Sequence, residues 1–224
     1  MEDLKRIVKE ELEPADEVNA VNKLQRIGDE LVCNYVLKIG DITIEPLWVE
    51  AYYFQINGKF KDVSCHRKAE QMKNFGKLYF HHRVGDQRSG VDLCLSDGDY
   101  YLSYLLKITL VNGVYTTQSE LHNKIYNAYI DNGEKLTIEK SNFAKKCCNA
   151  KRIRVTDGDY IEEPLASVRG VDEKLFGEKR LPNREELVKN YIMKNCKSLS
   201  NDEKIKYCTD ILGYCLKDIK EGKI

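Results

Sequence analysis

Hydrophobic residues recur with two different periods along this chain. Over residues 1–30 they return every three or four positions, which predicts two amphipathic helical stretches, and Gly28 is expected to close the second. After residue 30 the apolar residues come in short runs rich in β-branched and aromatic side chains, which are typical of strands. The runs expected to form strands cover residues 31–39, 42–54, 78–82, 91–95 and 100–111.

The second half of the chain carries a clear helix-start signal. Thr117 and Glu120 have the spacing of a capping box, which predicts a helix that continues to about residue 129. Two short extended segments, residues 153–155 and 160–161, are expected to flank a turn.

The carboxyl-terminal part is helical from Pro182 onward. An apolar stripe over residues 205–219 predicts a helix that carries Cys208 and Cys215 on one face. Such a stripe is typical of a core or docking surface.

Helices at both ends with strands between them predict an α+β fold, in which one mostly antiparallel β-sheet is flanked by helices. We expect a single α+β domain over residues 1–180 and a C-terminal helical extension, residues 181–224, packed on it. With 42% hydrophobic and 32% charged residues, the 224-residue chain has the composition of a soluble globular protein. No apolar run is long enough to cross a bilayer, and the first residues do not resemble a signal peptide. We therefore expect a cytoplasmic protein with no membrane partner.

The chain has eight cysteines, and none of them forms a Cys-x-x-Cys pair. Cys33 and Cys94 fall in runs expected to form strands. The pattern favours reduced, structural thiols over a disulfide framework or a zinc site.

Charge is balanced overall and uneven locally. The chain has 36 basic and 36 acidic residues, which by itself argues against a nucleic-acid partner. However, residues 59–88 carry eight bases against three acids, and residues 140–154 carry six bases and no acid. Two basic blocks of this kind predict a positive face for phosphate groups, the alternative being a solvated surface without a partner.

Glu50 is the leading candidate for chemistry. It ends an apolar run, Pro46-Leu47-Trp48-Val49, and an aromatic residue, Tyr52, follows two positions later. Low dielectric raises the pKa of a carboxyl group, and nearby histidines and cations hold it ionised. This arrangement predicts the general base of a hydrolase that acts on a polyanion, such as one that cleaves an N-glycosidic bond. The alternative is an ordinary salt-bridged strand end.

Several tyrosine and histidine residues follow Glu50 in the sequence. A flipped nucleobase is read by stacking and by hydrogen bonds to its edge. The residues that fit those roles are Tyr52, Tyr53, Tyr79, His66, His81 and His82. A metal site is the rival interpretation, since Cys65 and Asp92 add two further ligand types. The spacing matches no recognised zinc pattern, and we expect neither a metal nor a cofactor.

The order of several short motifs resembles that of the alkyladenine (3-methyladenine) DNA glycosylase family. The resemblance covers roughly residues 20–113, and the preserved order of the motifs carries it. The motifs are Val49-Glu50-Ala51-Tyr52, Asp62-Val63-Ser64-Cys65-His66, Gly76-Lys77-Leu78-Tyr79, Val91-Asp92-Leu93-Cys94-Leu95 and Leu105-Leu106-Lys107.

The resemblance implies a monofunctional DNA glycosylase for damaged (alkylated or deaminated) purines. Such an enzyme flips the base out of the duplex and hydrolyses its N-glycosidic bond without a metal, leaving an abasic site. Glu50 would activate the attacking water. The residues expected to bind the substrate are Tyr52, His66, Tyr79, His81, Asp92 and Lys107. His81 stands where the family has a stacking aromatic residue, and Lys107 stands where it has an arginine.

The implied partner is double-stranded DNA with damaged bases, bound by a monomer. Val84 falls near the family's intercalating tyrosine, and an aliphatic wedge can also unstack a base step. The residues expected to contact DNA are Arg67, Lys68, Arg83, Val84 and Arg88.

Two other classes of function remain open on the sequence. The first is a non-catalytic nucleic-acid-binding protein on the same fold, in which Glu50 is structural. The second is a helix-mediated interaction protein whose C-terminal stripe docks a partner.

Overall fold

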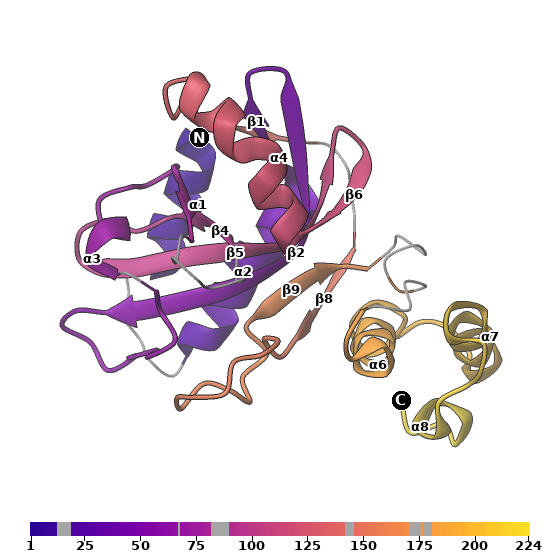
Figure 1. Ribbon diagram of the computed structural model, residues 1–224. Coiled ribbons are helices and arrows are strands. Elements are labelled where there is room, and N and C mark those ends of the chain that lie inside the picture. Colours follow the sequence, from indigo (N-terminus) through magenta and orange to yellow (C-terminus); the bar gives the residue numbers. More distant parts are fainter. Residues whose placement is uncertain (13–18, 67, 82–89, 142–145, 171–175, 177–180) are drawn as a thin grey trace.

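The computed structural model describes residues 1–12, 19–66, 68–81, 90–141, 146–170, 176 and 181–224 and has the expected α+β fold (Figure 1). The helices are α1 (Glu2–Leu12), α2 (Ala20–Asn34), α3 (Lys68–Gln71), α4 (Gln118–Asp131), α6 (Arg184–Asn195), α7 (Asn201–Leu212) and α8 (Lys217–Lys220). The strands are β1 (Tyr35–Ile39), β2 (Ile42–Gln55), β3 (Leu78–Phe80), β4 (Val91–Cys94), β5 (Tyr100–Val111), β6 (Val114–Thr117), β7 (Thr137–Lys140), β8 (Cys147–Ala150) and β9 (Ala166–Arg169).

The two long strands β2 and β5 form the centre of a curled sheet. The strand order is β3-β4-β5-β2-β1-β7, with β6 paired to the far end of β5. On the other edge of β2, β9 pairs with residues 48–50 and β8 pairs with β9. All of these pairings are antiparallel.

The pairing of β2 with β5 contains a double irregularity. Pro46 lies opposite Thr109, Trp48 opposite Ile108 and Val49 opposite Leu106, so that Leu47 on β2 and Lys107 on β5 each fall between paired residues. An extra residue of this kind changes which face of the sheet the next side chains occupy.

After this irregularity the two faces of β2 have different surroundings. After it, Val49, Ala51 and Tyr53 belong to the larger apolar core, which also contains buried residues of α1, α2 and α4. Successive side chains of a strand point to opposite faces. Glu50 and Tyr52 therefore lie on the other face, the one that carries the candidate site.

A second apolar core lies beside β8 and β9, where the C-terminal helices pack (Figure 1). Trp48 and Val168 meet Leu187 and Tyr191 of α6 in this core. Its buried members also include Cys208 of α7 and Ile219 of α8, which are fully covered. The other residues of the C-terminal apolar stripe are half-buried and pack against this core: Ile205, Ile211, Leu212, Cys215 and Leu216.

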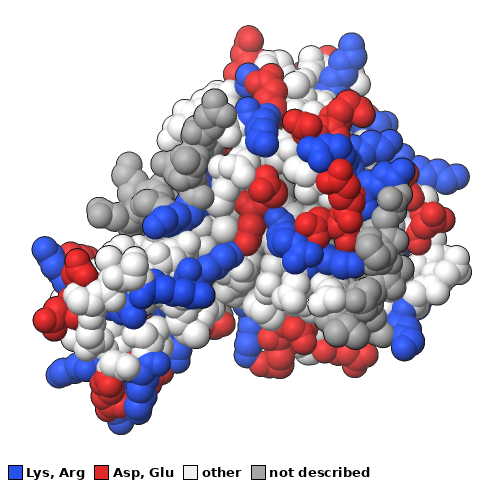
Figure 2. Space-filling view, turned by 180° about the vertical axis from the view of Figure 1, so that it is seen from behind, with Lys and Arg blue, Asp and Glu red and all other residues white. Residues whose placement is uncertain are grey.

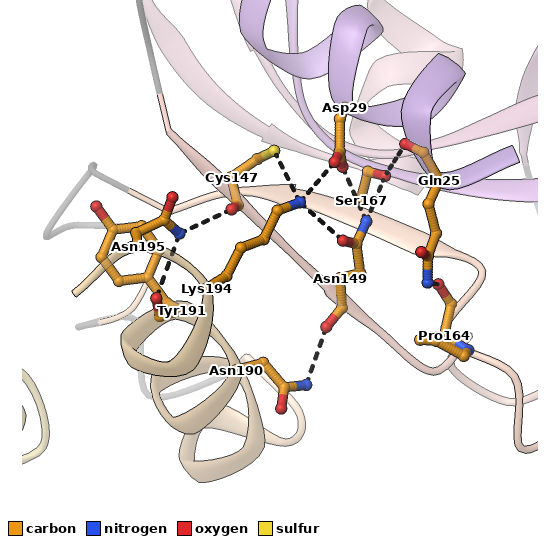
Figure 3. A network of polar contacts seen from close by, with 10 residues as sticks. All are labelled: Gln25, Asp29, Cys147, Asn149, Pro164, Ser167, Asn190, Tyr191, Lys194 and Asn195. Carbon is orange, nitrogen blue, oxygen red and sulfur yellow. Dashed lines mark hydrogen bonds and ion pairs between the residues drawn. The ribbon is translucent and has the colours of Figure 1, made fainter. Parts of the chain in front are cut away.

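A polar network joins α6 to the rest of the protein (Figure 3). The Lys194 ammonium donates to Asp29 Oδ2 at 2.5 Å and to Asn149 Oδ1 at 2.8 Å, and it lies 3.7 Å from Cys147 Sγ. Asn195 Nδ2 donates to the Cys147 carbonyl oxygen at 2.9 Å. These contacts connect α6 with α2 and β8.

Several expected boundaries are wrong. Helix α2 continues to Asn34, so residues 31–34 are helical and Cys33 lies in a helix. Gly28 does not end this helix. A Cβ atom there would lie 2.6 Å from Ser167 Oγ, so the glycine allows α2 to approach β9 closely.

The C-terminal helix expected over residues 205–219 is also interrupted. Gly213 adopts φ 82° and ends α7 in a left-handed cap, so Cys215 lies between α7 and α8. Residues 153–155 and 160–161 form no strand, whereas β6, β7, β8 and β9 were not anticipated. The capping box at Thr117 and Glu120 is present and begins α4 as expected. No helix in the described parts of the chain is long and apolar enough to span a membrane.

Candidate active site

The sheet register places the candidate residues in one row. Glu50 on β2 lies opposite Leu105 on β5, and Leu105 lies opposite Asp92 on β4. Asp92 in turn lies opposite Tyr79 on β3. Directly opposed residues of antiparallel strands share a face, so side chains from four strands meet on one surface.

Glu50 lies at the β2 end of this row and is completely buried. The Ile153 backbone N–H donates to Glu50 Oε1 at 2.8 Å, and Tyr52 donates its hydroxyl to Glu50 Oε2 at 3.3 Å. The Lys107 ammonium lies 3.3 Å from the same Oε2. Lys107 is the residue that falls between paired positions of β5, and the carboxylate therefore has a cation beside it.

Burial and charge act in opposite directions on Glu50. Desolvation by burial raises its pKa, while Lys107, the Ile153 N–H and Arg152 lower it, with a net rise. Burial and the neighbouring Glu50 charge raise the pKa of Tyr52 well above its usual value, so its hydroxyl stays a donor. The site thus combines a carboxyl group of raised pKa with donors that stabilise its ionised form.

A cavity of about 280 Å³ opens beside Tyr52. Four residues singled out on the sequence line it, from four separate segments of the chain: Tyr52, His66, His81 and Asp92. Leu105 and Tyr101 of β5 form part of the same wall, and residues 154–157 lie across from it. The structure therefore brings four of the expected substrate residues to one cavity, while Glu50 and Lys107 are not among the residues that line it.

Two imidazole rings stack at the cavity. The His66 and His81 ring centroids are 4.6 Å apart with an angle of 15° between the planes. Tyr79 does not line the cavity, and its ring meets His81 edge-on at 5.4 Å. Tyr79 thus supports the stack from behind.

Asp92 lies beside His81. Its Oδ2 lies 2.9 Å from His81 Nε2, an ion pair when the imidazole is protonated. Gln71 Nε2 and Ser103 Oγ donate to the same oxygen at 3.2 and 3.3 Å. The other oxygen, Oδ1, is buried and accepts no hydrogen bond from the described residues. One acceptor of this buried carboxyl group is therefore available beside the cavity.

The segment after β8 supplies groups that the sequence analysis did not identify. Arg152 belongs to a block expected at the surface, yet its side chain is 1% exposed and pairs with Asp62 Oδ2 at 2.5 Å. It also donates to the Ala51 carbonyl oxygen at 3.1 Å, and its guanidinium lies 4.7 Å from the centre of the Tyr52 ring. Arg152 therefore holds the Tyr52 strand in place, and it is not part of a positive face.

No local signal identifies these residues in advance. Arg152 meets Asp62 across 90 positions of sequence, and Ile153 meets Glu50 across 103. The run of bases over residues 140–154 and the extended segment expected over residues 153–155 fall in this region, and neither predicts these contacts.

Of the residues expected to contact DNA, one lies in the described part of the chain. Arg67, Arg83, Val84 and Arg88 lie outside the described residues, as does His82. Lys68 is described, and its ammonium lies 3.8 Å from the centre of the Phe54 ring. Figure 2, seen from behind Figure 1, shows basic and acidic side chains interspersed over much of that face.

The described residues offer no set of ligands for the metal site considered on the sequence. In the parts of the chain that the structure describes, no three His, Cys, Asp or Glu side chains are grouped to hold an ion. Cys65 is buried, and burial raises the pKa of its thiol.

Comparison with known proteins adds no relative. No protein-family model matches the chain, and no curated protein matches it either.

Proposed function

We propose that this protein is a monofunctional DNA glycosylase that hydrolyses the N-glycosidic bond of damaged (alkylated or deaminated) purines, with Glu50 activating water. One observation carries the proposal. A completely buried glutamate, bonded by the Ile153 N–H and paired with Lys107, accepts a hydrogen bond from Tyr52, whose ring lines a cavity together with His66 and His81. The sequence resemblance noted above supports the same function.

The cavity suits a single base. Its volume of about 280 Å³ is near the lower end of the range for small-ligand pockets. The Tyr52 and His81 rings offer faces for stacking, and Asp92 Oδ1 offers an acceptor for a base N–H group. A base extruded from a duplex needs this combination of stacking and edge recognition.

Glu50 would act on water at the sugar. The carboxylate takes a proton from water as the water oxygen bonds to C1′ and the bond from C1′ to the base nitrogen breaks. The departing base takes up a proton, and an abasic site remains with the strand uncut. Lys107 and the Ile153 N–H favour the ionised carboxylate before the step, while burial makes it a stronger base than free glutamate.

The test is base release from duplexes that carry hypoxanthine, ethenoadenine or an alkylated purine, with wild type compared with Glu50→Gln. Glu45→Gln is the matched control, because Glu45 lies on the same strand and pairs with Arg169 away from the cavity. Release by wild type and Glu45→Gln that is absent in Glu50→Gln would support the proposal. Release that survives in Glu50→Gln, or that wild type lacks on every lesion, would overturn it.

The complete burial of Glu50 favours a second candidate, a nucleic-acid-binding protein without activity. A carboxylate with three partners and no exposed surface is also what a structural ion pair looks like. This candidate predicts salt-sensitive duplex binding that is equal in wild type and Glu50→Gln, with base release by neither.

A further inference from the structure

A second cavity, of about 420 Å³, lies where Lys107 approaches Glu50. Its walls come from β2, β5, the first turn of α4 and the segment that carries Ile153. Arg154 lines this cavity as well as the first one. The proposed base-release mechanism uses the first cavity and leaves the second without a role.

The second cavity is rich in cationic and hydrogen-bonding donors. Lys107 lines it with a side chain that is 17% exposed. Arg154 has no ion-pair partner among the described residues and adopts a left-handed backbone with φ 61°. A non-glycine residue in this region is uncommon and recurs at ligand sites.

The acidic groups nearby are already bonded. Glu120 accepts hydrogen bonds from the Thr117 backbone N–H and hydroxyl, both at 2.8 Å, as part of the capping box. Glu50 accepts from Ile153 and Tyr52. Lys107 is paired with Glu50 Oε2 at 3.3 Å, whereas Arg154 has no ion pair among the described residues, so its charge is the one left for an anion.

Trp48 provides an independent indication of a ligand. Its side chain lines the second cavity and is 1% exposed. The indole N–H is buried, and it has no hydrogen-bond acceptor among the residues that the structure describes. A buried donor without an acceptor is costly, so a ligand in the cavity that supplied an acceptor to the indole N–H would be favoured.

The geometry points to a phosphate-binding site in the second cavity, separate from the base-binding cavity. A phosphate group offers several strong acceptor oxygens and a negative charge, which match two cations and the indole N–H. The apolar wall formed by Trp48, Ile108 and Leu181 has room for the organic part of a phosphate ester. The phosphate belongs either to a small phosphomonoester or to a nucleic-acid backbone.

Trp48 is the only tryptophan in the chain, so its fluorescence reports on this cavity directly. The full-length protein is titrated with ribose 5-phosphate, with ribose, with potassium chloride at matched ionic strength, and with an undamaged duplex. A saturable change with ribose 5-phosphate and none with ribose or chloride identifies a phosphomonoester site. A saturable change with the duplex alone identifies a backbone phosphate. An equal response to chloride, or no saturable response to any phosphate, would overturn the proposal.

A pair of variants tests the location. Ser119 is exposed in the first turn of α4 and lines the second cavity. Ser119→Glu adds a charge that the helix N-terminus tolerates but that repels an anion, whereas Ser119→Gln adds similar bulk without charge. We expect Ser119→Glu to weaken phosphate binding by about tenfold or more relative to Ser119→Gln. Equal affinities in the two variants would place the phosphate elsewhere and overturn the proposal.

This result does not depend on glycosylase activity. Phosphate binding is measured without a damaged base, and base release is measured through Glu50→Gln. Either proposal can therefore fail while the other stands.

Discussion

Two polar clusters lie on the two sides of β9, and they differ in how completely their groups are bonded. In the network around Lys194, the ammonium has three acceptors within reach, and the cluster joins α2, β8 and α6 (Figure 3). In the cluster around Glu50, two cavities adjoin the charged groups. Asp92 Oδ1 and Trp48 Nε1 have no hydrogen-bond partner there among the described residues.

The difference in bonding corresponds to a difference in role: the Lys194 network holds elements together, and the Glu50 cluster is the one proposed to carry out the reaction. A polar cluster whose groups are bonded to one another fixes the position of the elements that carry it. In a buried cluster that keeps unused donors and acceptors beside a cavity, a bound ligand can supply the missing hydrogen bonds. Substitutions in the two clusters should therefore affect different properties.

The largest effect is expected from Glu50→Gln. Loss of the general base should reduce the rate of base release by about a thousandfold, measured on a lesion that wild type processes. Unfolding in urea should show a stability equal to or above that of wild type, because the variant removes a buried charge whose pKa burial raises. A marked loss of stability would instead assign Glu50 to the structural class of cluster.

The pH dependence of base release should report the ionisation of Glu50. Because the base works only when ionised, release should increase with pH through the raised pKa of Glu50, by about tenfold for each pH unit below that pKa. The acid limb should lie above the value of 4.5 for an ordinary glutamate. A rate that stays constant down to pH 4.5 would exclude Glu50 as the base.

The free energy of unfolding should fall with pH over the range in which the rate of base release increases. A raised carboxyl pKa means that the folded state keeps its proton at a pH where the unfolded state has lost it. The contribution of Glu50 to the free energy of unfolding should therefore fall as pH rises from 4.5 through the raised pKa. The comparison of wild type with Glu50→Gln over that range isolates this contribution.

Asp92→Asn should have an intermediate effect. It replaces the carboxylate beside His81 and leaves the shape of the side chain nearly unchanged, so that the stacked imidazole loses its acidic neighbour. We expect kcat/KM for base release to fall by about tenfold, with Glu45→Gln again as the control. Wild-type kinetics in Asp92→Asn would show that the cavity does not depend on the position of His81.

The smallest effect is expected from Lys194→Met. Its side chain is 39% exposed, so solvent screens the ion pair with Asp29, and the free energy of unfolding should fall by about 1 kcal/mol. Base release should be unchanged. The control is Lys197→Met, an exposed lysine just beyond α6. A loss of activity in Lys194→Met without a loss of stability would contradict the contrast between the clusters.

Local patterns predicted the parts of the fold that depend on local interactions. The capping box fixed the start of α4, and the long apolar runs gave β2 and β5. Leu31 and Val32 were wrongly predicted to begin a strand, because an apolar pair at a helix end is also consistent with a strand. Both side chains are completely buried as part of α2, so packing within the fold favours the helix. Strands β7, β8 and β9 have only four residues each, too few for a period to be recognised.

The candidate site was predictable where residues follow one another along neighbouring strands. Glu50, Asp92 and Tyr79 were chosen from separate motifs, and the register of consecutive antiparallel strands puts them in one row. Arg152 and Ile153 were missed because their contacts require β8 to return to β2 through β9, which no local pattern encodes.

The double irregularity between β2 and β5 constrains how the sequence can change in length. Pro46 lies opposite Thr109 before it and Glu50 lies opposite Leu105 after it, so the extra residue of one strand is balanced by that of the other. A single insertion or deletion in β2 alone would turn Glu50 toward the apolar core. Loops of this protein can lengthen during evolution, but these two strands must gain or lose residues together.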